Sequence, residues 1–286
     1  MYELILAIIA LMVLVVASYT DLKVREVPDW ANYSLIFAAL GIRAMFSIQL
    51  GWNIIISGIL GFTVFFLLAF IFYHTNQWGG GDSKLLMGMG AVIGISFPFD
   101  KSSLTILWFF LILMFIGSIY GLIWMFYIAI RKRSLFVPNV KKRFIKHKIL
   151  HVSFAIITFN VLIMGLVVNI AWLIVLFPIF IYYLLMFVSI VEDSCFIVKV
   201  STERLTEGDW LAEDVFIKDK VVLRRKTLEK DDIEKLSQLE KSGNITHVAV
   251  KEGIPFVPSF FFAYVIVLFG GNFIAALMGS FQNIFI

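Results

Sequence analysis

Long apolar runs alternate with short polar loops along most of this chain, in which 60% of the 286 residues are hydrophobic. An α-helix needs about 20 apolar residues to cross a bilayer. We therefore expect eight membrane spans, with six as the alternative if the weaker runs merge or fail to cross. The expected spans are residues 2–20, 31–48, 52–73, 85–97, 103–130, 149–168, 171–190 and 257–279.

One segment, residues 191–252, departs from this pattern and carries 14 of the 20 acidic residues. Short alternating runs predict strands at 196–200, 215–223 and 245–250, with a hairpin turn at 218–220. Residues 229–242 have a helical apolar stripe that stops at Gly243. The fold class is therefore an all-α polytopic membrane protein with a small α+β insert. Its expected parts are a membrane-embedded helix bundle (1–190), a soluble insert (191–252) and a final span (253–286).

The basic segment 131–148 sets the expected orientation, because it holds eight Lys and Arg residues and no acid. Basic loops stay in the cytoplasm. Counting spans from this segment places the loops 21–30 and 74–84 and the insert on the cytoplasmic side. These two loops carry four of the six acidic residues outside the insert. The expected location is the cell membrane, with these carboxylates at its cytoplasmic face.

Two aspartates in these loops are the candidate reactive groups: Asp21 follows the first span, and Asp82 follows the glycines Gly79 to Gly81. Carboxylates near a bilayer are costly and often functional. Two carboxylates within hydrogen-bond reach share a proton, as in an aspartic protease. Gly79 and Gly81 would permit tight or left-handed backbone and a close approach by a peptide. Proton- or cation-coupled transport is the alternative use of the same pair, although the spans show no internal symmetry of the kind common in transporters.

The motifs around these aspartates resemble those of the type IV prepilin peptidases, including the archaeal preflagellin peptidases. One is the GxGD pattern Gly79-Gly80-Gly81-Asp82, and the other is D-x6-P-D from Asp21 to Pro28-Asp29. Residues 253–258 also resemble the entrance to the family's final helix. The resemblance implies a membrane aspartic endopeptidase with Asp21 and Asp82 as catalytic residues. It also implies a partner, the precursor of a type IV pilin or archaellin, cleaved at its short cytoplasmic leader.

Departures from the family pattern refine this interpretation. Many bacterial members have paired CxxC motifs and also methylate the new terminus, whereas this chain has only Cys195, so we expect no methyltransferase activity. The insert resembles those of some archaeal members and favours an archaeal source. Signal-peptide-peptidase and presenilin-like proteases also carry GxGD. The D-x6-P-D context here disfavours them.

Neighbouring residues are expected to shape the site or bind substrate: Gly79, Gly81, Pro28, Asp29 and Lys84. Asp29 begins the second span, where an acid also favours the helix dipole. Lys84 would bias the proton of the aspartate pair or simply extend to the membrane surface. A single cysteine and four scattered histidines predict no metal site and no cofactor. The net charge of +4 is better explained by membrane topology than by nucleic acid.

Overall fold

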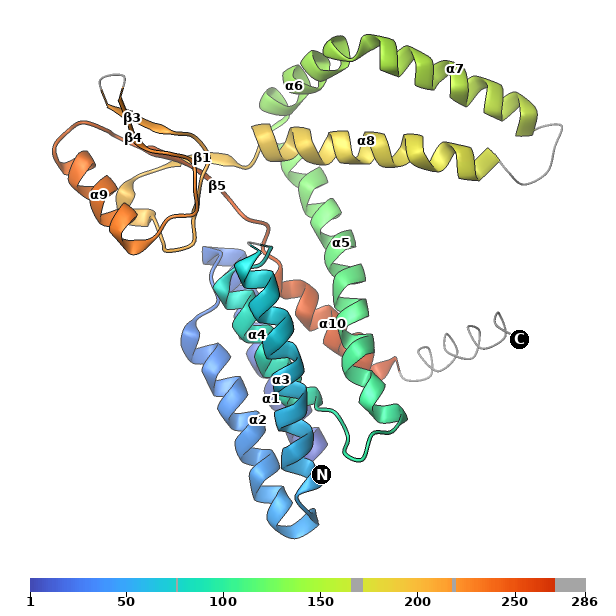
Figure 1. Cartoon of the computed structure of the whole chain (residues 1–286), viewed down its shortest axis with the longest axis vertical. Coiled ribbons are helices and arrows are strands. Elements are labelled where there is room, and N and C mark those ends of the chain that lie inside the picture. Colours follow the sequence, from blue (N-terminus) through green and yellow to red (C-terminus); the bar gives the residue numbers. More distant parts are fainter. Residues whose placement is uncertain (76, 166–171, 218–219, 271–286) are drawn as a thin grey trace. The chain divides into compact units, whose positions relative to one another are not determined.

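A computed structural model describes the chain except for residues 76, 166–171, 218–219 and 271–286. The described part is mostly helical, with a small region of β-structure between residues 197 and 251 (Figure 1). It divides into two compact units. The first holds Met1–Leu122 with the segment that begins at Ile254, and the second holds Ile123–Gly253.

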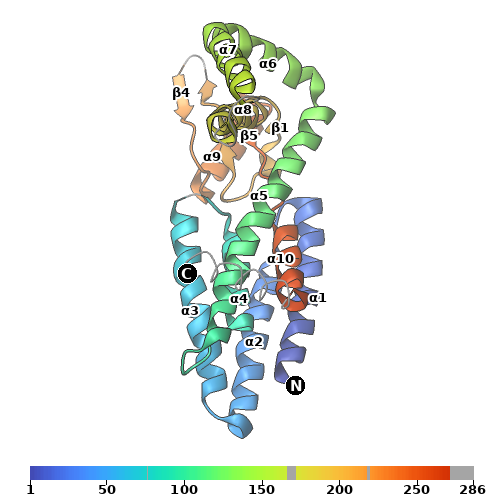
Figure 2. The same ribbon diagram turned by 90° about the vertical axis from the view of Figure 1, so that its right-hand side faces the viewer.

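The first unit is a helix bundle in which α1 to α4 lie side by side (Figure 2). The described elements of this unit are α1 (Tyr2–Val24), α2 (Asp29–Leu50), α3 (Asn53–His74), α4 (Gly80–Ile93), η1 (Lys101–Leu104), the first part of α5 (Thr105–Arg131) and α10 (Val257–Phe269). The short helix α4 contacts α1, α2 and α3. Leu85, Leu86 and Met89 of α4 are fully buried.

Glycines allow α3 and α4 to approach closely. A Cβ atom at Gly61 of α3 would collide with the carbonyl oxygen of Gly90 on α4. A Cβ atom at Gly90 would lie 2.9 Å from the Cβ of Phe65. Small residues at membrane helix crossings let two backbones come together and gain van der Waals contacts. Side chains larger than hydrogen at this crossing would push α4 away from α3.

A buried arginine caps the end of α4. Arg43 of α2 is only 3% exposed. Its guanidinium donates hydrogen bonds to the carbonyl oxygens of Ala91, Val92 and Ile93, at 2.9, 2.8 and 3.1 Å. The last carbonyls of a helix have no partner within it, and a cation there also opposes the negative end of the helix dipole. Arg43 therefore fixes the end of α4 that lies away from Asp82.

A tight connection joins α1 to α2. α1 ends where Arg25 adopts a left-handed conformation (φ 62°), and its N–H donates to the carbonyl oxygen of Asp21 at 2.9 Å. Pro28 directly precedes α2, and its carbonyl oxygen accepts a hydrogen bond from the N–H of Ala31 at 3.0 Å. The sequence motif D-x6-P-D thus spans a helix end, a turn and the next helix start.

The second unit begins within α5 and combines helices with two small sheets. Its further elements are α6 (Arg133–Lys146), α7 (Lys148–Gly165), α8 (Trp172–Ser194), β1 (Ile197–Val200), η2 (Thr202–Arg204), β2 (Trp210–Leu211), β3 (Val215–Ile217), β4 (Lys220–Leu223), α9 (Lys230–Lys241) and β5 (Val248–Lys251). Helices α6 and α7 both contact α8. The ring of Phe136 on α6 meets that of Phe187 on α8, with centroids 5.7 Å apart.

The sheets confirm the α+β character predicted for the insert. β5 lies between β1 and β2 and is antiparallel to both, with Lys251 paired to Ile197 and to Trp210. β3 and β4 form the predicted hairpin, although its turn at 218–219 lies outside the described residues. α9 ends near Gly243, which has the expected positive φ (73°). The strand β2 was not predicted, because two residues are too few to show an alternating pattern.

The prediction of a multi-pass membrane protein is confirmed. Five helices are long and apolar enough to cross a membrane within the described residues, and two shorter apolar helices accompany them. At about 1.5 Å per residue, the 14 residues of α4 extend about 21 Å, less than the roughly 30 Å of hydrocarbon. The expected runs 149–168 and 257–279 both end outside the described residues. The total of eight spans and the division at residues 191 and 253 stay predictions.

Candidate active site

Asp21 occupies the last turns of α1 and is tied to the start of α10. Its side chain is buried, at 6% exposure. Its Oδ2 accepts a hydrogen bond from the backbone N–H of Val257 at 2.9 Å. Val257 is the first residue of α10, and the first N–H groups of a helix have no partner within it. The carboxylate of Asp21 therefore supplies a cap for a helix that lies more than 200 residues later in the chain.

Asp82 lies in the first turn of α4, where Gly79 is the residue that precedes the helix. Its partly buried carboxylate interacts with the backbone N–H of Gly79 and with the charge of Asp21. The two predicted aspartates thus interact electrostatically from two helix ends, Asp21 in the last turn of α1 and Asp82 in the first turn of α4. Tyr120 of α5 also interacts with the charge of Asp21, so α5 contributes to the surroundings of this pair.

The glycines before Asp82 act through their size and not through left-handed backbone. Gly79 has φ −70° and ψ 164°, an extended conformation open to other residues, and Gly81 is helical with no positive φ. The expectation of left-handed backbone is therefore wrong at both positions. A Cβ atom at Gly81 would lie 3.2 Å from the Cβ of Val27. Gly81 thus allows α4 to pack closely against the turn between α1 and α2.

Asp29 and Lys84 form an ion pair that links α2 to α4. Lys84 Nζ lies 2.5 Å from Asp29 Oδ1 and 5.4 Å from the centre of the Tyr33 ring. Asp29 is also the first residue of α2, immediately after Pro28, as the helix-dipole interpretation expects. The sequence suggested separate roles for these two residues and did not predict their pairing. The pair holds the starts of α2 and α4 together beside the aspartates.

The sequence analysis missed several buried polar side chains that lie within three residues of Asp21, Asp29, Asp82 or Val257 along the chain. Asn32 on α2 is 0% exposed, and neither of its amide atoms has a hydrogen-bond partner among the described residues. The hydroxyl groups of Ser18, Ser83 and Ser259 are likewise buried without a partner there. Buried polar groups usually have partners, so these atoms are available to water or to a bound peptide. Their sequence signal was weak, because single Asn and Ser residues are common in membrane helices.

Trp78 connects the glycine loop to α10. Its ring centroid lies 5.0 Å from that of Phe72 on α3. On the other side it lies 5.4 Å from Phe256 and 5.6 Å from Phe260. This aromatic cluster holds the loop before Asp82 against the start of α10, which also binds Asp21. In the part of the chain that the structure describes, no group of three His, Cys, Asp or Glu side chains gathers as metal ligands would.

Comparison with known proteins points to one family. Residues 8–128 match the type IV leader peptidase family. A preflagellin peptidase of Methanocaldococcus jannaschii is 40% identical over 81 residues, which cover 28% of this chain and 34% of that relative. A preflagellin peptidase of Methanococcus voltae is 30% identical over 150 residues, which cover 50% of this chain and 63% of that relative. The chain spans less than two thirds of the length of these curated relatives. The matched residues 8–128 carry both aspartate motifs, so over this segment the chain is similar to the type IV leader peptidase family.

Proposed function

We propose that this protein is a membrane aspartic endopeptidase that removes the short leader from type IV prepilin-like or archaellin precursors. The interaction between Asp21 and Asp82 at neighbouring helix ends carries this proposal. Its substrate class is supported by the relatives, which are named preflagellin peptidases.

The two aspartates would divide the work of peptide hydrolysis. The ionised member takes a proton from water, and the water oxygen attacks the scissile carbonyl carbon. The protonated member donates its proton to the carbonyl oxygen. Collapse of the tetrahedral intermediate then breaks the C–N bond, and the leaving nitrogen receives a proton from the pair. The hydrogen bond from Val257 to Asp21 Oδ2 orients one carboxylate, which favours a reactive geometry.

Asn32 is suited to holding the backbone of the cleaved segment. Gly81 of α4 lies next to Val27, and Gly88 lies next to Leu35 of α2, so the two helices run parallel from the aspartate end. Asn32 lies on the stretch of α2 between these two contacts. An extended peptide exposes N–H and C=O groups that need partners where water is scarce. The unpartnered amide of Asn32 offers one donor and one acceptor for such a peptide unit.

We infer that the site opens at the cytoplasmic face of the cell membrane. Asp21 lies in the last turn of α1, whereas Asp82 and Asp29 lie in the first turns of α4 and α2. The basic segment 131–148 supports this orientation through the positive-inside rule. A position at a helix end also gives the reaction access to water, which it consumes.

The test is co-expression of the full chain with a prepilin or archaellin precursor, read as a mobility shift on leader removal. Asp21→Asn and Asp82→Asn keep the side-chain size but remove the ionisable group, and each should abolish cleavage. Asp100→Asn is the matched control, because Asp100 lies in an exposed loop and caps η1. Membrane insertion of all three variants is measured in parallel.

Cleavage at the normal rate by either Asp21→Asn or Asp82→Asn would refute the catalytic pair. Proton-coupled uptake by the wild-type protein that both variants lose, without any cleavage of precursors, would instead support the transporter alternative. Accessibility labelling of single cysteines placed in the loop 26–28 tests the orientation. Labelling only from the outer side would overturn the cytoplasmic assignment.

A further inference from the structure

A cavity in the second unit lies at the joint between α6 and α7. It has a volume of about 350 Å³ and is lined by Phe144, Ile145, Lys148, His151, Val152 and Ala155. The first two residues end the basic helix α6, and the other four begin the apolar helix α7. The cavity therefore lies where the basic segment gives way to apolar sequence, the position expected for a membrane–water boundary.

His151, one of the residues that line this cavity, carries an unused hydrogen-bonding atom. His151 is 9% exposed, and its Nδ1 lies 3.1 Å from the hydroxyl oxygen of Tyr183 on α8. Its Nε2 is buried and has no hydrogen-bond partner among the described residues. When Nδ1 accepts from the Tyr183 hydroxyl, Nε2 carries the proton and is a donor without an acceptor. A ligand with an acceptor oxygen would satisfy it.

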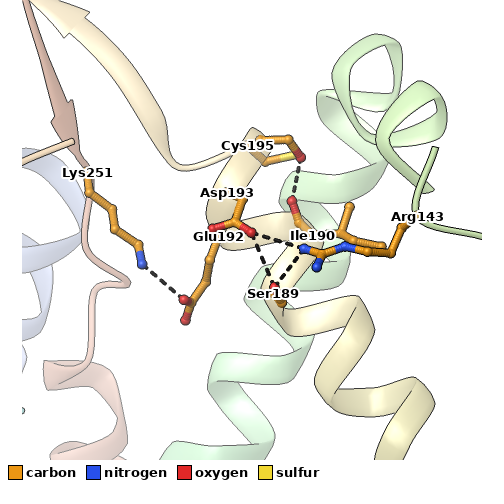
Figure 3. A network of polar contacts seen from close by, with 8 residues as sticks. Arg143, Ser189, Ile190, Glu192, Asp193, Cys195 and Lys251 are labelled. Atoms are coloured by element: carbon orange, nitrogen blue, oxygen red, sulfur yellow. Dashed lines mark hydrogen bonds and ion pairs between the residues drawn. The ribbon is translucent and has the colours of Figure 1, made fainter. Parts of the chain in front are cut away.

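Positive charge at the cavity is also uncompensated. Lys148 is exposed and forms no ion pair with any described residue. Two other cations of the basic segment have partners: Arg143 binds Ser189 and Asp193 of α8 (Figure 3), and Lys132 donates to the Cys195 carbonyl oxygen. Lys148 and His151 thus both line this space, Lys148 with an exposed positive charge and His151 with an unpartnered buried nitrogen.

The remaining lining is apolar and aromatic. Phe144 stacks on the His151 ring, with centroids 4.2 Å apart and an angle of 19° between the planes. Tyr182 and Tyr183 of α8 lie near the same histidine, at 6.0 and 5.6 Å between ring centroids. Tyrosines are enriched at membrane interfaces, where one end of the ring is apolar and the other is wet. The two tyrosines lie outside the lining itself, in which Phe144, Ile145, Val152 and Ala155 form an apolar surface. Such a surface suits an acyl chain and gives a free inorganic anion no partner.

We propose that this cavity binds one phospholipid with an anionic headgroup. Lys148 and the Nε2 of His151 bind the phosphate, and an acyl chain lies against Phe144, Val152 and Ala155. Charge complementarity supports this occupant, because residues 131–148 hold eight basic residues and no acid, and anionic lipids attract such segments. The site does not depend on the proposed peptidase activity, since all its residues lie in the second unit.

Native mass spectrometry of the detergent-purified full chain tests the proposal. Phosphatidylglycerol, phosphatidylcholine and inorganic phosphate are each added, and the retained ligand is measured. We expect one phosphatidylglycerol molecule to be retained at least tenfold better than phosphatidylcholine, and inorganic phosphate not to displace it. The double change Lys148→Ala with His151→Phe removes both headgroup contacts while it keeps a ring against Phe144. It should abolish this preference.

Two further variants separate specific binding from general effects. Ala155→Trp fills the apolar part of the cavity on an exposed position and should reduce retention as strongly as the double change. Lys141→Ala removes an exposed charge from the same basic segment outside the cavity and should alter retention less than twofold. Circular dichroism checks that each variant folds. Equal retention of the two lipids, displacement by inorganic phosphate, or equal effects of Lys141→Ala and the double change would overturn the proposal.

Discussion

Replacement of Arg43 by methionine should loosen α4 and with it the position of Asp82. Methionine keeps an unbranched side chain of similar length but has no donors. Arg43 gives hydrogen bonds to three carbonyls at the end of α4, and two more to the Ile54 carbonyl oxygen and the Ser57 hydroxyl at 3.2 and 3.3 Å. The variant leaves the buried end of α4 without these partners.

The expected size of this effect follows from two opposing contributions. A hydrogen bond from a charged donor is worth about 1.5–3 kcal/mol, so the three bonds to α4 together amount to roughly 4.5–9 kcal/mol. Loss of the guanidinium also removes the cost of burying a charge, which offsets part of this sum. We expect the free energy of unfolding to fall by about 3–5 kcal/mol, because three carbonyl groups of α4 stay buried without a donor at roughly 1–3 kcal/mol each.

Unfolding of the purified protein in mixed micelles, followed by tryptophan fluorescence, measures this change. Arg43→Lys should fall between wild type and Arg43→Met, because an ammonium group keeps the charge but lacks the planar fork of donors. Arg131→Met, at an exposed position, should change the free energy of unfolding by less than about 0.5 kcal/mol. A loss below about 1 kcal/mol in Arg43→Met would refute the role of Arg43 as the cap of α4.

Three further outcomes are expected. Asn32→Leu should slow precursor cleavage, while the free energy of unfolding stays level or rises by about 1 kcal/mol, because the unpartnered amide of Asn32 contributes no internal hydrogen bond. An unchanged cleavage rate would show that Asn32 does not bind the substrate. Gly61→Ala should destabilise the bundle by about 1–3 kcal/mol, because the added methyl group collides with α4. Gly41→Ala on α2 is the control and should not destabilise it, because no atom lies within 4 Å of the added Cβ. Equal unfolding midpoints of the two variants would contradict this prediction. The hydroxyl and N–H of Thr202 donate to the Glu240 carboxylate and hold its pKa below the ordinary value of 4.5. The stability that these two hydrogen bonds give the fold is therefore present above pH 4.5, and it is lost as the pH falls through the lower pKa of the folded state. Hydrogen exchange at the Thr202 amide, relative to its intrinsic rate, should accelerate over that range in the wild type and show no such step in Glu240→Gln.

The sequence could locate the helices and the two aspartates because both leave local signals. In a bilayer each helix satisfies its own backbone hydrogen bonds, so a run of apolar residues is enough to indicate one. The motif from Asp21 to Pro28 and Asp29 is likewise local, because it corresponds to the end of one helix, a short turn and the start of the next helix. The topology count placed Asp21 and Asp82 on one side of the membrane, and in the structure the charge of Asp21 acts on the carboxyl group of Asp82. The insert followed its alternating pattern except at β2, which is too short to leave one.

Contacts between distant segments required the tertiary structure. The apolar pattern predicts that α10 is a helix, but it does not predict that the first N–H of α10 donates a hydrogen bond to Asp21. In the same way, the sequence places Arg43 inside the expected span 31–48, but it does not indicate that this side chain binds the carbonyl oxygens at the end of α4. Lys84 and Asp29 each had a plausible separate role, and only their meeting across two helices makes them an ion pair. Helix formation is decided by neighbouring residues, whereas these contacts depend on which helix ends pack together, and many arrangements of similar apolar helices satisfy the same local pattern.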